Sequence, residues 1–222
     1  MSMQKLLVIP LAALSTLAWA QVGAPSYRAG EAWTYREING YNNIERATVV
    51  REVVQADGTV RIVTKFGDGK LISDALYPVP GALKSGAIND RARGSFEPSL
   101  AMTPYPLAEG QRWSERAVRS DEVWKERRRT RVDGRIRGWE TVRVPMGEFK
   151  ALRIERVIYV GDHDPFRSES TREEIEWYVP ELKMPVKLQV REFYRDHPYD
   201  LTERILPGDW FIHELTAMKP AS

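Results

Sequence analysis

Three histidines and their acidic neighbours are the side chains best suited to chemistry in this sequence. The histidines are His163, His197 and His213. His163 stands between Asp162 and Asp164, and a turn there could present two carboxylates and an imidazole to a divalent cation. A polar turn between two strands accounts for the same residues. We favour the turn, because closed metal sites usually draw their ligands from separate segments.

The motifs of the common enzyme classes are absent from the sequence. Without any cysteine there is no nucleophilic thiol, no Cys-x-x-Cys redox pair and no Cys-ligated metal. His213-Glu214 begins like the zinc-protease motif, but Ala217 stands where that motif needs its second histidine. No Gly-x-Ser-x-Gly, Ser-x-x-Lys or nucleotide-binding glycine loop is present. We therefore favour a non-catalytic protein without a cofactor, with a metal-assisted envelope hydrolase at residues 162–164 as the alternative.

Three glutamates, Glu173, Glu174 and Glu176, lie within four residues. On a strand, Glu174 and Glu176 point the same way, opposite Ile175 and Trp177, because successive side chains alternate between the two faces. The two carboxylates of a glycosidase instead come from distinct elements, about 5 to 9 Å apart across the substrate. We therefore expect Glu174 and Glu176 to face solvent, with Ile175 and Trp177 towards the core.

Positive charge is concentrated in residues 112–143. This segment holds 11 Lys and Arg against 6 Asp and Glu, a local net charge of +5, whereas the whole chain has 33 against 31. The near-balance of the whole chain argues against a nucleic-acid partner. Arg127, Arg129 and Arg131 share one face of a strand and could meet lipid head groups, anionic glycans or an acidic partner. A solvated edge strand that uses charge to prevent edge-to-edge pairing is the alternative.

The first twenty residues predict export. Lys5 precedes an uncharged run that ends in Ala18-Trp19-Ala20, the small-x-small pattern of a signal-peptide cleavage site. Cleavage would leave Gln21 first, and no cysteine follows that could carry a lipid anchor. The alternative is an uncleaved anchor, although the run is shorter than the roughly 18 apolar residues of a span. We expect a soluble periplasmic or secreted protein with no stable membrane span after cleavage.

The rest of the chain has the patterns of an all-β domain. Short alternating segments predict about ten to eleven antiparallel strands in a curled sheet, half-open barrel or sandwich. Asp57-Gly58 and Asp133-Gly134 each predict a hairpin turn, because both central residues of that turn favour positive φ. We expect one domain over residues 21–222, with a long loop rich in Pro and Gly at residues 78–106 and a flexible tail at residues 216–222.

Two segments share the pattern Gly-x-x-Trp-Ser/Thr-x-Arg. One runs from Gly30 through Trp33 and the other from Gly110 through Trp113. A structural interpretation is that each glycine allows a tight entry into a sheet and each tryptophan covers the end of the core. A duplicated half-domain is the alternative.

The second of these segments begins a longer series of motifs. Gly110-x-x-Trp113 is followed by TVRVPMGEFKA at residues 141–151, by WYVPE at residues 177–181 and by PVKL at residues 185–188. This order resembles uncharacterised exported bacterial β-proteins, the TapB-like group and related domains of unknown function, over roughly the C-terminal 80 to 100 residues. Met146 and Lys183-Met184 depart from the group's pattern, which has Ala and Gly there. The resemblance implies an antiparallel β fold and no established catalytic residues.

Tryptophans supply the remaining candidate site. Trp33, Trp113, Trp139 and Trp177 fit a core, and some could instead line the cavity of a half-open barrel. Together with the export signal, they lead us to expect a periplasmic protein that binds an apolar or amphipathic cell-envelope ligand or an envelope protein partner.

Overall fold

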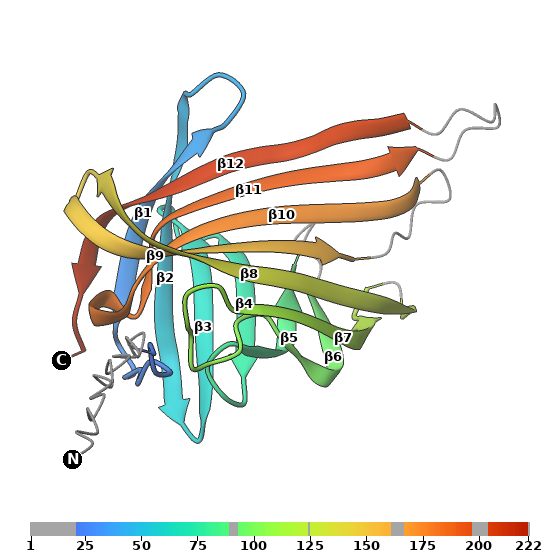
Figure 1. The fold of residues 1–222 in the computed structure, drawn as a ribbon, viewed down its shortest axis with the longest axis horizontal. Helices are drawn as coiled ribbons and strands as arrows, with labels where there is room; N and C mark the ends of the chain where they lie inside the picture. Colours follow the sequence, from blue (N-terminus) through green and yellow to red (C-terminus); the bar gives the residue numbers. More distant parts are fainter. Residues whose placement is uncertain (1–20, 89–92, 124, 161–166, 197–203, 222) are drawn as a thin grey trace, which may run out of the picture.

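The computed structural model describes residues 21–88, 93–123, 125–160, 167–196 and 204–221. They form a closed antiparallel barrel of twelve strands, in which neighbours in sequence are neighbours in space and β1 pairs with β12 (Figure 1). The strands are β1 (Ala32–Asn39), β2 (Glu45–Asp57), β3 (Thr59–Phe66), β4 (Leu71–Tyr77), β5 (Ala82–Ala87), β6 (Arg93–Ala101), β7 (Arg112–Asp121), β8 (Arg127–Val144), β9 (Gly147–Tyr159), β10 (Arg167–Val179), β11 (Met184–Asp196) and β12 (Arg204–Lys219), with a 3-10 turn, η1 (Pro180–Leu182), before β11.

This architecture confirms the all-β antiparallel prediction and corrects its details. The barrel is closed rather than half-open, and it has twelve strands rather than ten or eleven. The segment predicted as a long loop contains β5 and β6. Proline has no N–H to donate to a β-ladder, but Pro98 is tolerated in β6 for two reasons. The last β6 residue that pairs with β7 is Glu97, and the register between β6 and β5 shifts where Pro98 lies.

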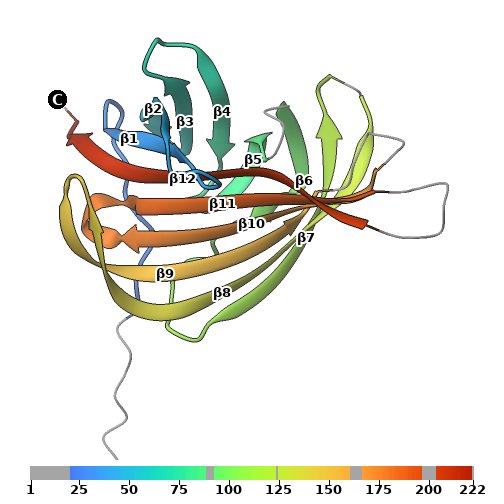
Figure 2. The same ribbon diagram turned by 90° about the horizontal axis from the view of Figure 1, so that it is seen from above.

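The C-terminal residues also differ from the prediction of a flexible tail. Residues 217–219 pair with the start of β1, Ala217 opposite Thr34 and Lys219 opposite Ala32. This pairing closes the barrel and leaves β1 without a free edge along this length. In Figures 1 and 2, β8 to β12 run side by side as one long curved wall.

The two predicted Asp-Gly turns have different outcomes. Gly58 joins β2 to β3 with a φ of 69°, which confirms the first hairpin. Gly134 instead lies inside β8, opposite Trp113 of β7, and a Cβ atom at Gly134 would stand 2.0 Å from the Trp113 ring. The second turn prediction is therefore wrong, because this glycine makes room for an aromatic ring and does not reverse the chain.

The two Gly-x-x-Trp segments form the same local structure. The Gly30 amide donates to the Val53 carbonyl and the Gly110 amide to the Ile136 carbonyl, and both glycines have positive φ. The residues on either side of each glycine also match. The Arg28 amide donates to a side-chain oxygen of Glu31 at 2.9 Å, and the Ala108 amide donates to the side-chain oxygen of Gln111 at 2.9 Å. The interpretation of glycine at a tight entry is confirmed, at the start of strands β1 and β7.

One face of each strand points into the barrel, and not all of its side chains are apolar. In β9, the buried inner row is Leu152, Ile154, Arg156 and Ile158. Arg156 is only 4% exposed. In β10 the inner row holds Glu174, whereas Trp177 lies on the outer face beside Lys187 and Arg153. The prediction that Glu174 faces solvent is therefore wrong, because cationic side chains inside the barrel neutralise it.

Candidate functional site

The barrel encloses a cavity of about 450 Å3. Its walls come from strands on both sides of the barrel and combine apolar, aromatic and charged side chains. The apolar part includes Val49, Ile62, Ala75, Leu83, Ile88 and Met102 from β2 to β6 and the segments that flank β5 and β6. The volume lies in the range of about 300 to 1,000 Å3 that is typical of small-molecule sites.

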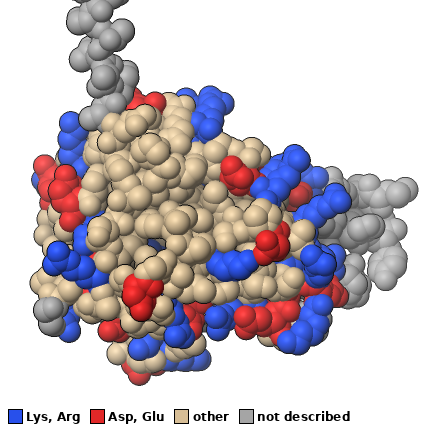
Figure 3. All heavy atoms as spheres, turned by 90° about the horizontal axis from the view of Figure 1, so that it is seen from below, with Lys and Arg blue, Asp and Glu red and all other residues tan. Residues whose placement is uncertain are grey.

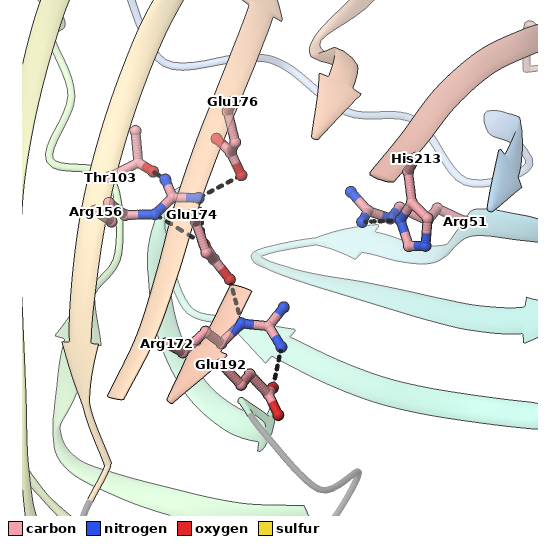
Figure 4. A network of polar contacts seen from close by, with 8 residues as sticks. All are labelled: Arg51, Thr103, Arg156, Arg172, Glu174, Glu176, Glu192 and His213. Atoms are coloured by element: carbon pink, nitrogen blue, oxygen red, sulfur yellow. Dashed lines mark hydrogen bonds and ion pairs between the residues drawn. The ribbon is translucent and has the colours of Figure 1, made fainter. Parts of the chain in front are cut away.

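One set of polar side chains in the cavity is extensively paired (Figure 4). We call it the Arg156 cluster, and it consists of Thr103, Arg156, Arg172, Glu174, Glu176 and Glu192. Arg156 donates to Glu174 at 2.7 Å and to Thr103 at 2.8 Å, and it also forms an ion pair with Glu176. Arg172 bridges Glu174 at 2.6 Å and Glu192 at 3.0 Å. The cross-strand register places Arg156 of β9 directly opposite Glu174 of β10.

The pairing fixes the charge states in this cluster. Burial opposes ionisation of Glu174, but Arg172 and Arg156 outweigh it and lower the pKa of Glu174 to about 2. Burial likewise acts to lower the pKa of Arg156, and Glu176 and Glu174 raise it above its usual value. Arg156 and Glu174 are therefore both charged at neutral pH. The two arginines and three glutamates of the cluster have a formal charge of −1.

Arg51 on β2 has a different environment. Its guanidinium lies 5.1 Å from the centre of the Tyr35 ring, and its Nη2 atom is 3.4 Å from Nδ1 of His213 on β12. Within the described part of the chain, Arg51 forms no ion pair. Figure 4 shows Arg51 and His213 apart from the Arg156 cluster, and both groups line the same cavity.

His213 is held neutral beside Arg51. Burial lowers the pKa of His213, and Arg51 and Arg172 lower it further against the effect of Glu37. Nε2 of His213 is 3.0 Å from Glu37 Oε2, so the neutral ring donates there and presents Nδ1 as an acceptor to Arg51. Arg46 lies 3.9 Å from Glu37, so β1 and β2 together contribute two arginines and one carboxylate to the lining, a formal charge of +1.

Three tyrosines add polar groups to the cavity lining. They are Tyr27, Tyr77 and Tyr105. Burial raises the pKa of each phenol, so all three are neutral hydroxyls. The hydroxyl of Tyr27 donates to the Lys183 carbonyl at 3.0 Å.

The four tryptophans singled out from the sequence do not come together, and none of them lines the cavity. Trp33 is fully buried and donates its indole N–H to the Leu182 carbonyl at 2.9 Å. Trp113 packs against Gly134, and Trp139 is 38% exposed. Trp177 donates to Glu140 at 2.9 Å.

The arginines singled out from the sequence lie on the outside of the barrel. Arg127, Arg129 and Arg131 alternate along β8 with the buried Thr130 and Val132. Arg131 contacts Asp133 at 3.2 Å and lies 4.0 Å from the centre of the Tyr159 ring. In Figure 3, Lys and Arg side chains gather towards the right-hand end of the view, with several carboxylates among them.

The candidate metal ligands Asp162, His163 and Asp164 lie outside the described residues. Among the residues that are described, no group of three or more His, Asp or Glu side chains could hold a metal ion. In the same part of the chain, no helix has the length and hydrophobicity needed to span a bilayer.

Sequence reasoning missed Arg51, Arg172, Glu37 and His213 as members of a site. Arg156 did carry a signal, because it interrupts the apolar row of β9, and a charge in such a row indicates a buried partner. Arg51 also interrupts an apolar row, between Val49 and Val53. Its relation to His213 depends on the β1–β12 closure, which no local pattern predicts.

Comparisons with known proteins give no family for this chain. No family model matches it, and no curated protein matches it. The resemblance to the TapB-like group therefore stays a prediction.

Three solved structures are similar in fold to this chain, each with 14% sequence identity to it. The match to a protein from Parabacteroides distasonis described as a lipoprotein covers 88% of this chain and 97% of that protein, with a TM-score of 0.47. The match to an exported protein with a YmcC-like fold from Bacteroides fragilis covers 90% of this chain and 100% of that protein, with a TM-score of 0.45. The match to the hypothetical lipoprotein YmcC from Escherichia coli covers 91% of this chain and 92% of that protein, with a TM-score of 0.43. At these scores, the similarity carries no inference about function.

Proposed function

We propose that this chain is an exported, non-catalytic protein that binds a small amphipathic molecule inside its barrel. The observation that carries the proposal is the cavity of about 450 Å3, whose lining combines apolar side chains from β2 to β6 with charged side chains from β2, β9 and β10. Small-molecule sites typically combine an apolar lining with a few fixed polar groups that orient the ligand. The signal sequence predicted for residues 1–20 supports export, and thus a ligand from the cell envelope.

Native mass spectrometry of the full chain, expressed in a bacterial host and recovered from the periplasm, tests this proposal. We expect a bound small molecule that organic extraction releases. Ala75→Phe fills the cavity from β4 and should abolish the added mass, whereas Ala217→Phe, at an exposed position of β12, should keep it. A ligand retained by the folded Ala75→Phe variant would place binding outside the cavity. A wild-type protein with no bound molecule and no affinity for added amphiphiles would contradict the proposal.

A second candidate function uses the outside of β7 and β8 as a surface for anionic lipid head groups. Two cross-strand pairs there consist of residues with like charge: Arg112 lies opposite Arg135, and Arg116 lies opposite Arg131. Such pairs are destabilising, so their presence favours an external anion that relieves them. In the described part of the chain, Arg127 and Arg129 form no ion pair.

Sedimentation with phosphatidylglycerol vesicles tests the second candidate. Each arginine near an anionic surface contributes about 1 kcal/mol, so Arg127→Gln/Arg129→Gln/Arg131→Gln should weaken binding by roughly 100-fold. Neutral phosphatidylcholine vesicles and high salt provide the controls, and neither condition should support binding. Equal sedimentation of the wild-type and triple-variant proteins would contradict a role for this face.

A further inference from the structure

Arg51 is a cation that faces the cavity without a counter-ion among the residues that the structure describes. The other cavity-lining arginines each have a carboxylate nearby: Arg156 and Arg172 contact Glu174, and Arg46 lies 3.9 Å from Glu37. Among the described residues, the only polar side-chain contact of Arg51 is with the Nδ1 atom of His213, a neutral acceptor. Since a guanidinium has five N–H donors, most of its donor capacity is unused.

Free hydroxyl groups lie in the same register row as Arg51. Thr64 of β3 is directly opposite Arg51, and Ser73 of β4 is directly opposite Thr64. All three side chains line the cavity. In the described part of the chain, neither hydroxyl has a side-chain hydrogen bond. Directly opposite side chains have Cβ atoms about 5 Å apart, so the row offers hydroxyl donors beside the base of Arg51.

Two groups of charges in the cavity lining have opposite formal sums. Arg46, Arg51 and Glu37 of β1 and β2 sum to +1, and the Arg156 cluster sums to −1, while Lys183 and Asp209 add one charge of each sign to the lining. An anionic head group is attracted to the first group and repelled by the second. The apolar surface of Ile62, Ala75 and Leu83 lies on β3 to β5, next to the row of Arg51, Thr64 and Ser73.

We propose that the ligand is an amphiphile with one carboxylate head group, which binds Arg51 while its tail packs against Ile62, Ala75 and Leu83. This inference rests on the proposed function and names the class of ligand. A carboxylate fits because its two oxygens accept two parallel N–H groups from a guanidinium. The head group provides the counter-ion that Arg51 lacks, and Thr64 and Ser73 supply further donors.

Isothermal titration with four probes tests the inference. The probes are decanoate, decan-1-ol, decylammonium and acetate, each used below the concentration at which it forms micelles. We expect decanoate to bind the wild-type protein at least about tenfold more tightly than decan-1-ol, because a hydrogen-bonded charge is worth at least that factor. Decylammonium should bind more weakly than the alcohol. Acetate should not bind measurably, since it lacks the tail.

Variants separate Arg51 from the rest of the protein. Arg51→Gln should weaken decanoate binding at least about tenfold and leave decan-1-ol binding unchanged. Arg61→Gln, at an exposed arginine of β3 that does not line the cavity, is the matched control and should change neither. Thr64→Val, which keeps the shape of the side chain, should weaken decanoate binding by a smaller factor.

Each contrary result has a separate meaning. Equal affinity of wild-type protein for decanoate and decan-1-ol would overturn the carboxylate inference and leave the proposed function standing, and this comparison needs no variant. Unchanged decanoate binding by folded Arg51→Gln would also overturn it. Acetate binding as strong as that of decanoate would replace the amphiphile with a small free anion. If none of the four probes binds, both the inference and the proposed function are contradicted.

Discussion

The Arg156 cluster and the group around Arg51 line the same cavity but differ in how their charges are paired. Arg156 meets Glu174 and Glu176 and is itself buried at 4% exposure. Arg51 meets a neutral histidine and an aromatic ring. Both are interior arginines on barrel strands, so the presence or absence of carboxylate partners is the main difference between them.

This difference indicates separate roles. A buried arginine with its carboxylates in place stabilises the fold only as a unit, because removal of one partner leaves the other charged and desolvated. An interior arginine without a counter-ion weakens the unliganded protein, and such a charge is more readily explained by binding. We therefore expect changes at Arg156 to act on stability and changes at Arg51 to act on ligand affinity.

The largest expected effect is from Arg156→Gln. The substitution leaves Glu174 and Glu176 without their shared cation, so we expect a loss of about 3 to 5 kcal/mol in the free energy of unfolding. Urea denaturation at pH 7 measures it. Arg137→Gln, which breaks an exposed pair with Glu155, is the matched control and should cost less than about 1 kcal/mol. Equal losses in the two variants would mean that the Arg156 cluster is not a buried structural unit.

The next effect is acid sensitivity from Glu174. Burial opposes its ionisation, but Arg172 and Arg156 lower its pKa to about 2, below the usual value near 4.5. The ionised form is therefore favoured by folding, and its contribution is complete above about pH 4.5 and is lost as the pH falls towards 2. Urea denaturation between pH 5 and pH 3 should show a steeper loss of stability in wild-type protein than in Glu174→Gln. Parallel pH profiles would contradict the lowered pKa.

A smaller effect is expected from His213, at higher pH. Burial lowers its pKa, and Arg51 and Arg172 lower it further, although Glu37 opposes them. The unfolded chain takes up the proton first as the pH falls below about 6.5, so this contribution to stability is present above that pH and is lost below it. Arg51→Gln removes one of the lowering charges, and the pKa of His213 should then rise. NMR titration of the imidazole measures it, and an unchanged or lower pKa in the variant would contradict the contact.

The smallest expected effect is that of Arg51→Gln on stability. In the described part of the chain, no carboxylate loses a partner in this substitution, so the free energy of unfolding should stay within about 1 kcal/mol of wild type or increase. Urea denaturation beside Arg156→Gln gives the direct comparison. A loss as large as that of Arg156→Gln would show that Arg51 is a structural charge and would remove the distinction between the two groups.

Local patterns in the sequence predict much of the fold. The Asp57-Gly58 hairpin follows from turn chemistry that is contained in two residues. Gly134 shows the limit of this reasoning, because its function depends on Trp113 of a neighbouring strand. Closure by β1 and β12 is likewise invisible in local patterns, since it joins the two ends of the domain.

The site was harder to predict than the fold. The sequence predicts a solvated face for Glu174 and Glu176, because Ile175 and Trp177 have the apolar character of the core side of a strand. In the structure, the inner face of β10 carries charges because Arg156 and Arg172 lie opposite or beside them. Knowledge of the β9–β10 register would be needed to foresee that pairing. A charge inside an apolar row, as at Arg51 and Arg156, is the signal that the sequence does contain.

A crystal structure of the wild-type protein with decanoate tests the central claim most directly. We predict electron density for the carboxylate against the Arg51 guanidinium, with N···O distances of about 2.7 to 2.9 Å, and for the alkyl chain along Ile62, Ala75 and Leu83. The side chains of the Arg156 cluster should keep their partners. Decanoate bound outside the barrel, or inside it with the carboxylate away from Arg51, would contradict the account.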